Sequence, residues 1–468
     1  MSKEKSVFFQ KYFVTDKAFY KKVLMILIPV VLQSMINQGV NMMDTIMVGQ
    51  LGDMAIAASS QANQFYSLFQ IFCMGLSAAG LVLTAQYFGA GDMKTVRRVF
   101  DLLLQLLILL GALFAVLTFL FPEQIMAIYV PGKTEVIRLG AQYLRITAFI
   151  FIPHGIALVM SNVARSVGNA KLGLYVAILS FAVNIGANYV FIFGKLGFPA
   201  MGVMGAALGT LVARIVELLV CAVYLLKVEK VLKYRPTGLF KLPSPALFKE
   251  FKRLGLPAVI SDALLGFAGT AISMIVGRIP GEEVIGAWAI VMVVDRMCTV
   301  AIQGATSAAG VVVGQTVGEG NFDRAQREGW TFFFMSLALG ILAAGLVLLV
   351  GEASIGLYKI TPATHDVAVV MMQSSALIVC FQAIQSTLSK GVLRGGGDTK
   401  FLMVADVLFQ WCASIPLGIL VCLVWKLPPF WILISLRIDN FIKSVWLIFR
   451  LKSGKWIHKA KSMNEAEA

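Results

Sequence analysis

One apolar stretch of the chain carries polar side chains at helical spacing, and one of them is an acid. The stretch from Ser34 to Asp53 reads SMINQGVNMMDTIMVGQLGD, with its polar side chains three and four residues apart. That spacing places them on one face of a helix, which we call the polar stripe. The polar stripe consists of Ser34, Asn37, Gln38, Asn41, Asp44 and Thr45. A carboxylate beside amide oxygens can bind a hard cation or exchange a proton, so the polar stripe predicts an ion site.

Asp44 is the acid of the polar stripe, and two interpretations of it remain open. An ionisable group inside an apolar segment is costly, and this favours a function in cation coupling. The alternative is a carboxylate at a helix end whose head reaches water. Asn37, Gln38 and Asn41 either ligate the same cation or hydrogen-bond neighbouring helices.

Further candidates lie in other apolar segments. Asn184 and Asn188 are one helical turn apart and can contribute amide groups to the ion site. Asp262, Asp295 and Arg296 form a charged set in the second half of the chain. This set is either a substrate or proton site, or a buried ion pair in which Arg296 neutralises one of the acids.

Other charged residues are expected to be structural. Asp439 and Lys443 have the i, i+4 spacing of a helical ion pair. Asp398 belongs to a glycine-rich turn after Arg394. For Asp406 the sequence favours neither a structural nor a functional role.

Composition identifies the kind of protein that must position these residues. Hydrophobic residues make up 58% of 468 residues and charged residues only 14%, which is typical of a polytopic membrane protein. The long apolar runs predict helices rather than the short alternating strands of a membrane barrel. The net charge of +15 lies in loops and tails beside these runs, so we expect a lipid bilayer and no nucleic acid as partner. The six cysteines stand singly, without the spacing of a disulfide framework or a zinc site.

The apolar runs predict twelve transmembrane helices. We expect them at residues 23–48, 55–87, 96–120, 138–160, 172–193, 202–226, 255–277, 284–313, 330–351, 366–389, 401–424 and 429–450. Lys and Arg concentrate in alternate connections and in both tails, which predicts a multi-pass protein of the cell membrane with both termini in the cytoplasm. The expected organisation is a leader at 1–22, an N-lobe at 23–226, a basic cytoplasmic linker at 227–254, a C-lobe at 255–450 and a tail at 451–468.

The two halves of the chain repeat each other. At a shift of 229 residues, Gln86, Gly89, Gly91 and Arg98 meet Gln315, Gly318, Gly320 and Arg327. Because each unit contains six predicted helices, both units enter the membrane from the same side and are parallel repeats. We therefore predict an all-α membrane protein with two six-helix lobes around a central cleft.

Several stretches together resemble the multidrug and toxic compound extrusion (MATE) family. They are PVVLQSMINQGVNMMDTIMVGQLGDMAIAA, AQYFGAGD, VGQTVGEGN, RSVGNAK, RGGGDTK and RLKSGKW. The resemblance implies export of organic, often cationic compounds in exchange for Na⁺ or H⁺, with Asp44 at the position of the family's first-helix carboxylate. Some members carry Asp where Asn188 stands, and some carry a Glu where Leu265 stands, so that Asp262 would substitute one turn earlier.

The predicted function is an ion-coupled antiporter for a small organic substrate, acting as a monomer. Its coupling ion is Na⁺ or H⁺, and no other cofactor is expected.

One alternative is a flippase for a lipid-linked or polar metabolite, which requires a more cationic cleft. The candidate cations for such a cleft are Arg145, Arg214, Arg296, Arg437 and Lys443. A less favoured alternative is an intramembrane enzyme. No P-loop, HExxH or Ser-His-Asp arrangement supports nucleotide or hydrolytic chemistry.

Overall fold

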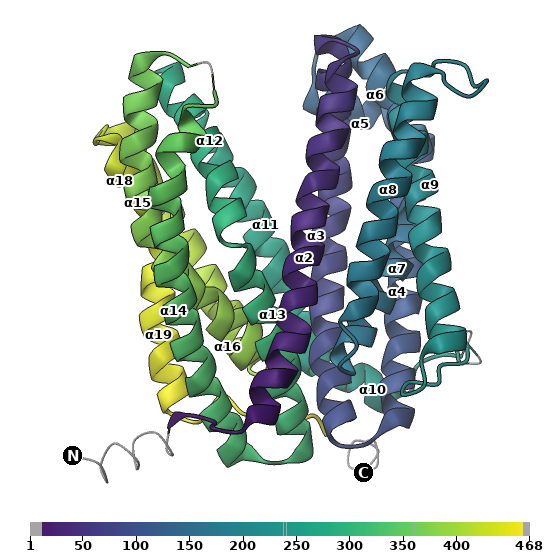
Figure 1. Ribbon diagram of the computed structural model, residues 1–468, viewed down its shortest axis with the longest axis vertical. Coiled ribbons are helices and arrows are strands. Elements are labelled where there is room, and N and C mark those ends of the chain that lie inside the picture. Colours follow the sequence, from purple (N-terminus) through teal and green to yellow (C-terminus); the bar gives the residue numbers. More distant parts are fainter. Residues whose placement is uncertain (1–11, 237, 240, 359, 462–468) are drawn as a thin grey trace. The chain divides into compact units, whose positions relative to one another are not determined.

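The computed structural model describes residues 12–236, 238–239, 241–358 and 360–461, and these residues form helices joined by short connections (Figure 1). The helices of the first half are α2 (Lys17–Gly49), α3 (Asp53–Gly89), α4 (Met93–Leu120), α5 (Pro122–Tyr129), α6 (Thr134–Thr147), α7 (Phe151–Ser166), α8 (Lys171–Phe193), α9 (Val203–Val223) and the π-helical η1 (Tyr224–Val228). No strand occurs among the described residues. The all-helical prediction is therefore confirmed.

The second half repeats this organisation with more interruptions. Its helices are α10 (Pro245–Glu250), η2 (Phe251–Gly255), α11 (Leu256–Val276), α12 (Glu282–Cys298), α13 (Val300–Glu319), α14 (Phe322–Ile355), α15 (Pro362–Ser386), η3 (Thr387–Leu393), α16 (Thr399–Asp406), η4 (Val407–Ser414), α17 (Ile415–Ile419), η5 (Leu420–Val424), α18 (Pro429–Leu436) and α19 (Ile438–Lys452). The π-helical η4 ends at Ser414, two residues before Pro416, whose missing N–H removes one hydrogen bond of the regular helical ladder.

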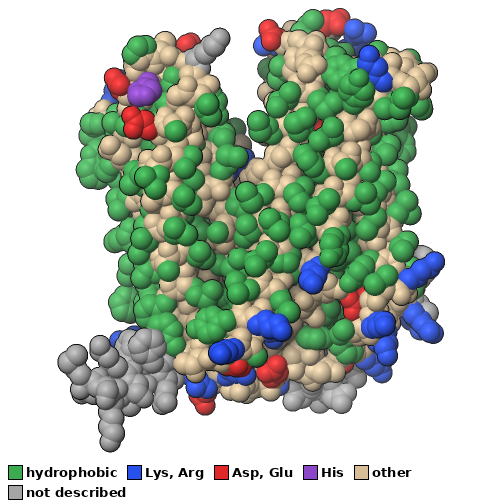
Figure 2. Space-filling model, in the orientation of Figure 1, with side chains coloured by type: hydrophobic (Ala, Val, Ile, Leu, Met, Phe, Trp, Pro, Cys, Tyr) green, Lys and Arg blue, Asp and Glu red, His purple; other side chains and the backbone are tan. Residues whose placement is uncertain are grey.

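All twelve predicted spans fall on helices. Nine helical segments of the described chain are long and apolar enough to cross a membrane, or ten when the bent pair α6 and α7 counts as one span. The two other predicted spans, 202–226 and 429–450, correspond to α9 with η1 and to α18 with α19. Figure 2 shows apolar side chains over the middle of the visible face and Lys and Arg side chains gathered near its lower end. This distribution suits helices that cross a bilayer.

The contacts between residues divide the chain into two compact units. Unit 1 contains residues 1–31, 85–92 and 249–468, and unit 2 contains residues 32–84 and 93–248. Helix α2 contributes to both units, and the division falls two residues after Pro29. The predicted lobe boundaries, which follow the chain order, stay predictions.

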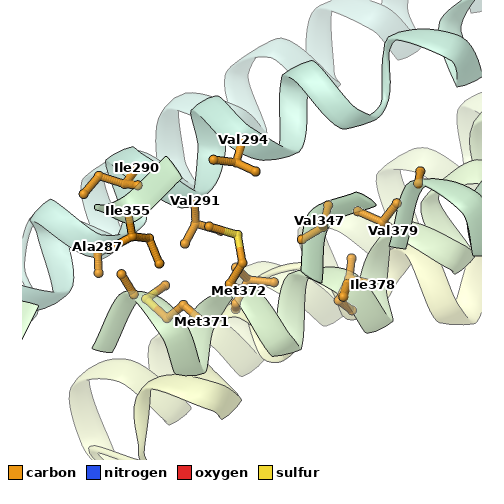
Figure 3. Packing of buried hydrophobic residues seen from close by; sticks show 14 of the residues in the cluster. Ala287, Ile290, Val291, Val294, Val347, Ile355, Met371, Met372, Ile378 and Val379 are labelled. Carbon is orange, nitrogen blue, oxygen red and sulfur yellow. The ribbon is translucent and has the colours of Figure 1, made fainter. Parts of the chain in front are cut away.

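Each unit has its own apolar core. In unit 1, buried side chains of α12, α14 and α15 gather in one layer, including Val291, Val347 and Met372 (Figure 3). In unit 2, Met47 and Val48 of α2 pack with Leu144 of α6 and Ala207 of α9. This second core lies at the end of the polar stripe and fixes the helices that carry the candidate site.

The repeat seen in the sequence has a direct counterpart in the packing of unit 1. A Cβ atom on Gly89 would lie 2.7 Å from the carbonyl carbon of Gln315, and one on Gly318 would lie 2.7 Å from the carbonyl carbon of Gln86. Gln86 and Gly89 are the repeat partners of Gln315 and Gly318, so the same two positions contact each other reciprocally. A two-fold relation between the repeats produces this kind of exchange. Small residues at such crossings allow helix backbones to approach closely.

We expect Gly318→Ala to destabilise the protein by about 1–3 kcal/mol, because the added methyl group meets backbone atoms that cannot rotate away. Thermal unfolding of the purified protein measures the loss. Gly345→Ala is the matched control, because nothing lies within 4 Å of a Cβ atom built on Gly345 of α14. Equal stability of the two variants would contradict the close crossing.

Candidate ion and substrate site

Unit 2 contains a cavity of about 570 Å³ that the polar stripe faces. Six of its helices, α2, α3, α6, α7, α8 and α9, contribute to the wall. The polar side chains of the wall are Asn37, Asn41, Asp44, Thr45, Ser59, Ser60, Asn63, Tyr66, Ser67, Gln70, Tyr143, His154, Ser180, Asn184, Thr210, Arg214 and Glu217. A cavity lined by many polar side chains inside an apolar helical bundle is the expected setting for a polar or charged ligand.

Asp44 and the two asparagines of α8 come together at this cavity. The Nδ2 group of Asn188 donates a hydrogen bond of 2.5 Å to Oδ1 of Asp44 and one of 3.3 Å to Oδ1 of Asn184. Asn188 is fully buried and Asn184 is 2% exposed, whereas Asp44 is half-buried at the edge of the cavity. The helical spacing on α2 and α8 thus brings the carboxylate of Asp44 and the amides of Asn184 and Asn188 into one hydrogen-bonded group.

The acceptor side of Asn188 has no partner. Its Oδ1 atom is buried and has no hydrogen-bond partner in the described chain. A buried carbonyl oxygen without a donor is costly, and this one lies against Gly209 of α9, whereas the Nδ2 group of the same amide contacts Asp44. The donor set of carboxylate and amide oxygens matches what Na⁺ and other hard cations prefer.

The rest of the polar stripe divides between the cavity and other surroundings. Asn37 and Asn41 line the cavity, and Asn41 accepts a hydrogen bond of 2.9 Å from Thr45 through its backbone carbonyl. Gln38 is half-buried and does not line the cavity. The prediction that Gln38 shares a site with Asp44 therefore lacks support from this geometry.

An ion pair on α9 was not recognised as a pair from the sequence. Nη1 of Arg214 lies 2.7 Å and 2.8 Å from the two carboxylate oxygens of Glu217, and both side chains line the cavity. Glu217 is 9% exposed, and buried His154 of α7 lies on the same wall with its Nδ1 atom unpaired. The i, i+3 spacing of opposite charges within the apolar span 202–226 was the available signal.

The charge balance of the cavity follows from these contacts. Glu217 is neutralised by Arg214, whereas Asp44 forms no ion pair among the described residues. The cavity therefore holds two acids and one arginine, and Asp44 is the acid that forms no ion pair within the described chain. This residue is the one that can respond to an added cation or proton.

The charged residues of the second half form ion pairs with partners that differ from the expected ones. Asp262 receives two hydrogen bonds from Arg394, of 2.8 Å and 2.9 Å, in a bidentate pair. Asp295 is 2% exposed and lies 3.2 Å from Nη1 of Arg437. Arg296 is exposed and pairs with neither acid, so the expectation that it neutralises one of them is wrong. Adjacent residues of a helix point about 100° apart, so Arg296 of α12 does not share the buried face that carries Asp295.

Two further charged groups behave as structural elements. The predicted pair of Asp439 and Lys443 is confirmed at 3.2 Å, and the same ammonium group lies 3.0 Å from Asp406. Asp398 forms a bidentate pair with Arg450, at 2.6 Å and 3.1 Å. The structure thus assigns Asp406, which the sequence left open, to a buried cluster of one base and two acids.

The position of Asn188 depends on the absence of a side chain opposite it. A Cβ atom on Gly209 of α9 would lie inside contact distance of Oδ1 of Asn188 and 2.9 Å from its backbone nitrogen. Gly209→Ala is therefore expected to displace the amide from Asp44 and to lower thermal stability by about 1–3 kcal/mol. Gly186→Ala on α8 is the control, since nothing lies within 4 Å of that position. A Gly209→Ala protein as stable as the control would show that the amide does not need this space.

Comparison with known proteins agrees with this architecture. The MatE family model matches residues 29–190 and 257–422, which are the two repeats and together make up most of the chain. The chain belongs to the MatE family. It is therefore a transporter of the membrane and not an enzyme.

Relatives of this MatE protein with curated names cover nearly its whole length. It is 27% identical over 414 residues to "Probable multidrug resistance protein NorM" of Agrobacterium fabrum, covering 87% of each chain. It is 26% identical over 443 residues to a protein of the same name from Thermotoga maritima, covering 94% of each chain.

Solved structures share the fold of the MatE protein. One is described as an outward-facing multidrug resistance MATE family transporter of the MOP superfamily, with a TM-score of 0.82 at 19% identity, over 93% of this chain and 96% of that one. A eukaryotic MATE transporter gives a TM-score of 0.80 at 18% identity, over 96% and 98% of the two chains. These similarities support the two-repeat, all-helical membrane fold.

Proposed function

We propose that this MatE protein is an antiporter that exports organic cations in exchange for Na⁺ or H⁺. The observation that carries the proposal is the charge of the unit 2 cavity. Asp44 faces this cavity without a basic partner among the described residues, whereas Glu217 is held by Arg214. A cavity with one uncompensated carboxylate attracts a cation, and two cations that compete for one carboxylate exchange for each other.

The coupling ion binds at Asp44 in this proposal. Asp44 and Asn184 supply its oxygen ligands, Asn188 orients the Asp44 carboxylate through its Nδ2 group, and Asn37 and Asn41 lie on the same wall. For H⁺, the carboxylate takes up the proton and the amides hold the carboxyl group in place.

The substrate occupies the broader part of the same cavity. Tyr66 and Tyr143 line this cavity, and Asn63 accepts a hydrogen bond of 3.3 Å from Tyr143. Aromatic faces and a carboxylate together favour flat organic cations. The relatives named multidrug resistance proteins support export of varied compounds rather than of one metabolite.

Transport follows from alternating access of the two lobes in the cell membrane, with both termini in the cytoplasm. Binding of the coupling ion favours one arrangement of the lobes only to the extent that the ion binds that arrangement more tightly. The charged set of Asp262 and Asp295 serves the C-lobe as structural ion pairs, because each acid already has a guanidinium partner.

Efflux from proteoliposomes tests this proposal. Vesicles loaded with a fluorescent organic cation are given an inward Na⁺ gradient, an inward H⁺ gradient, both gradients or neither. We expect efflux to accelerate with one of the two ions and to stop when both gradients are dissipated. Equal efflux in all four conditions would contradict ion coupling. Movement of labelled lipid in place of the dye would favour the flippase.

A further inference from the structure

A second depression lies on the surface of unit 1, outside the ion-coupling cavity. It has a volume of about 590 Å³ and lies against α16 and α19. We call it the α19 groove, and its main wall residues are Phe401, Phe441, Val445, Trp446, Phe449 and Arg450. Its wall is formed mostly by carbon atoms.

The apolar wall of the α19 groove is open to the surroundings of the helix. Phe441 is 43% exposed, Val445 41% and Phe449 68%, and they follow one another at steps of four residues along α19. Trp446 is also 41% exposed, and its ring lies 4.9 Å from that of Phe409 and 5.9 Å from that of Phe401. Because α19 belongs to a membrane span, a hydrocarbon chain of the bilayer is the surrounding that suits this face.

One end of the α19 groove is cationic. Ser453 and Lys455 complete its wall directly after the end of α19 at Lys452, and Lys400 lies at the start of α16. Lys400, Lys452 and Lys455 are exposed and form no ion pair among the described residues. Arg450 differs from them because Asp398 holds it at 2.6 Å and its guanidinium lies 4.6 Å from the Phe401 ring centroid.

We propose that the α19 groove is a binding site for an anionic glycerophospholipid. One acyl chain lies along Phe441, Val445 and Trp446, and the phosphate lies near Lys452 and Lys455. The anionic headgroup of such a lipid would meet the lysines at one end of the groove, and its hydrocarbon chain would meet the apolar side chains along the rest. The same cations would repel an organic cation. They would also repel a second copy of this chain placed on the groove by two-fold symmetry.

Quenching of tryptophan fluorescence by brominated lipids tests the proposal. The full-length protein in detergent is titrated with phosphatidylglycerol or phosphatidylcholine that carries the same brominated acyl chains. The difference between the parent and Trp446→Phe isolates the signal of Trp446. We expect phosphatidylglycerol to quench this signal at a concentration about 25-fold lower than phosphatidylcholine does. Each of the two lysines is expected to raise the affinity for the anionic lipid about fivefold.

Two variants separate the headgroup from the groove. Lys452→Gln combined with Lys455→Gln is expected to remove most of the preference, while Lys94→Gln, at an exposed lysine of α4, leaves it intact. Equal quenching by both lipids in the parent would overturn the proposal, as would loss of the preference in the Lys94→Gln control. A Trp446 signal that depends on protein concentration without lipid would also overturn it, because a second copy would then cover the groove. Neither lysine belongs to the proposed transport site, so efflux by the double variant is a check on its folding.

Discussion

Asp44→Asn is expected to reduce ion-driven efflux at least about tenfold while leaving the protein folded. The substituted amide keeps the size of the side chain and can still accept the hydrogen bond from Nδ2 of Asn188. What it loses is the charge, which is the uncompensated acid charge of the cavity, since Arg214 holds Glu217. Without that charge neither Na⁺ nor H⁺ favours one state of the transporter over the other, and the gradient cannot drive export.

Two measurements distinguish a loss of coupling from a loss of structure. Efflux is compared under the four gradient conditions, and thermal stability is measured with and without Na⁺. If Na⁺ is the coupling ion, it should stabilise the parent protein and not the variant, because a bound ligand stabilises only a state that binds it. Asp53→Asn, the same change at an exposed acid of α3 outside the cavity, is the control and should retain efflux. Parental efflux by Asp44→Asn would refute the assigned role.

Lys443→Met is expected to have the largest effect on stability, a loss of about 3–5 kcal/mol. Lys443 is 1% exposed, and its ammonium lies 3.0 Å from Asp406 and 3.2 Å from Asp439. Removal of the base leaves two acids in a buried site. Ser261 donates to Asp406 and Ser414 donates to Asp439, at 3.0 Å in the latter case, but neutral hydroxyls cannot replace a cation.

The cause of this loss can be tested by removing the acids as well. Lys443→Met combined with Asp406→Asn and Asp439→Asn should recover much of the stability, because no uncompensated charge then remains. Thermal unfolding in detergent gives the comparison. Lys452→Met, on the same helix but exposed, should change stability by no more than about 0.5 kcal/mol. A triple variant less stable than the single one would show that the cluster stabilises through its hydrogen bonds rather than through its charge balance.

On α2 and α8, the spacing of polar residues in the sequence predicted which side chains lie together. The spacing of three and four residues predicted that Asp44 shares a face with Asn37 and Asn41, and all three line the cavity. The same rule placed Asn184 beside Asn188. Both predictions depend on the period of a helix, which the chain adopts wherever its backbone hydrogen bonds cannot reach water.

The spacing of residues along a helix did not predict which base pairs with each buried acid. Arg296 follows Asp295 directly, yet Arg437 from the other end of the C-terminal half holds the acid. Asp262 likewise pairs with Arg394, which lies far along the chain at the end of η3, just before a glycine-rich turn. Neighbours along a helix point in different directions, so a buried acid takes its base from another helix, and helix packing selects that base.

The sequence alone determined that this protein is a helical membrane protein built from two repeats, with an acid on the polar face of its first long helix. Apolar length, charge asymmetry and repeated motifs are properties of the chain itself, and they hold whatever the packing. Only the tertiary structure decided that Asp44 faces the cavity without an ion-pair partner in the described chain, and that Asn188 reaches Asp44 across 144 positions. Those facts depend on the distances between helices, and the close approach of α9 to α8 at Gly209 shows how a residue without a side chain sets them.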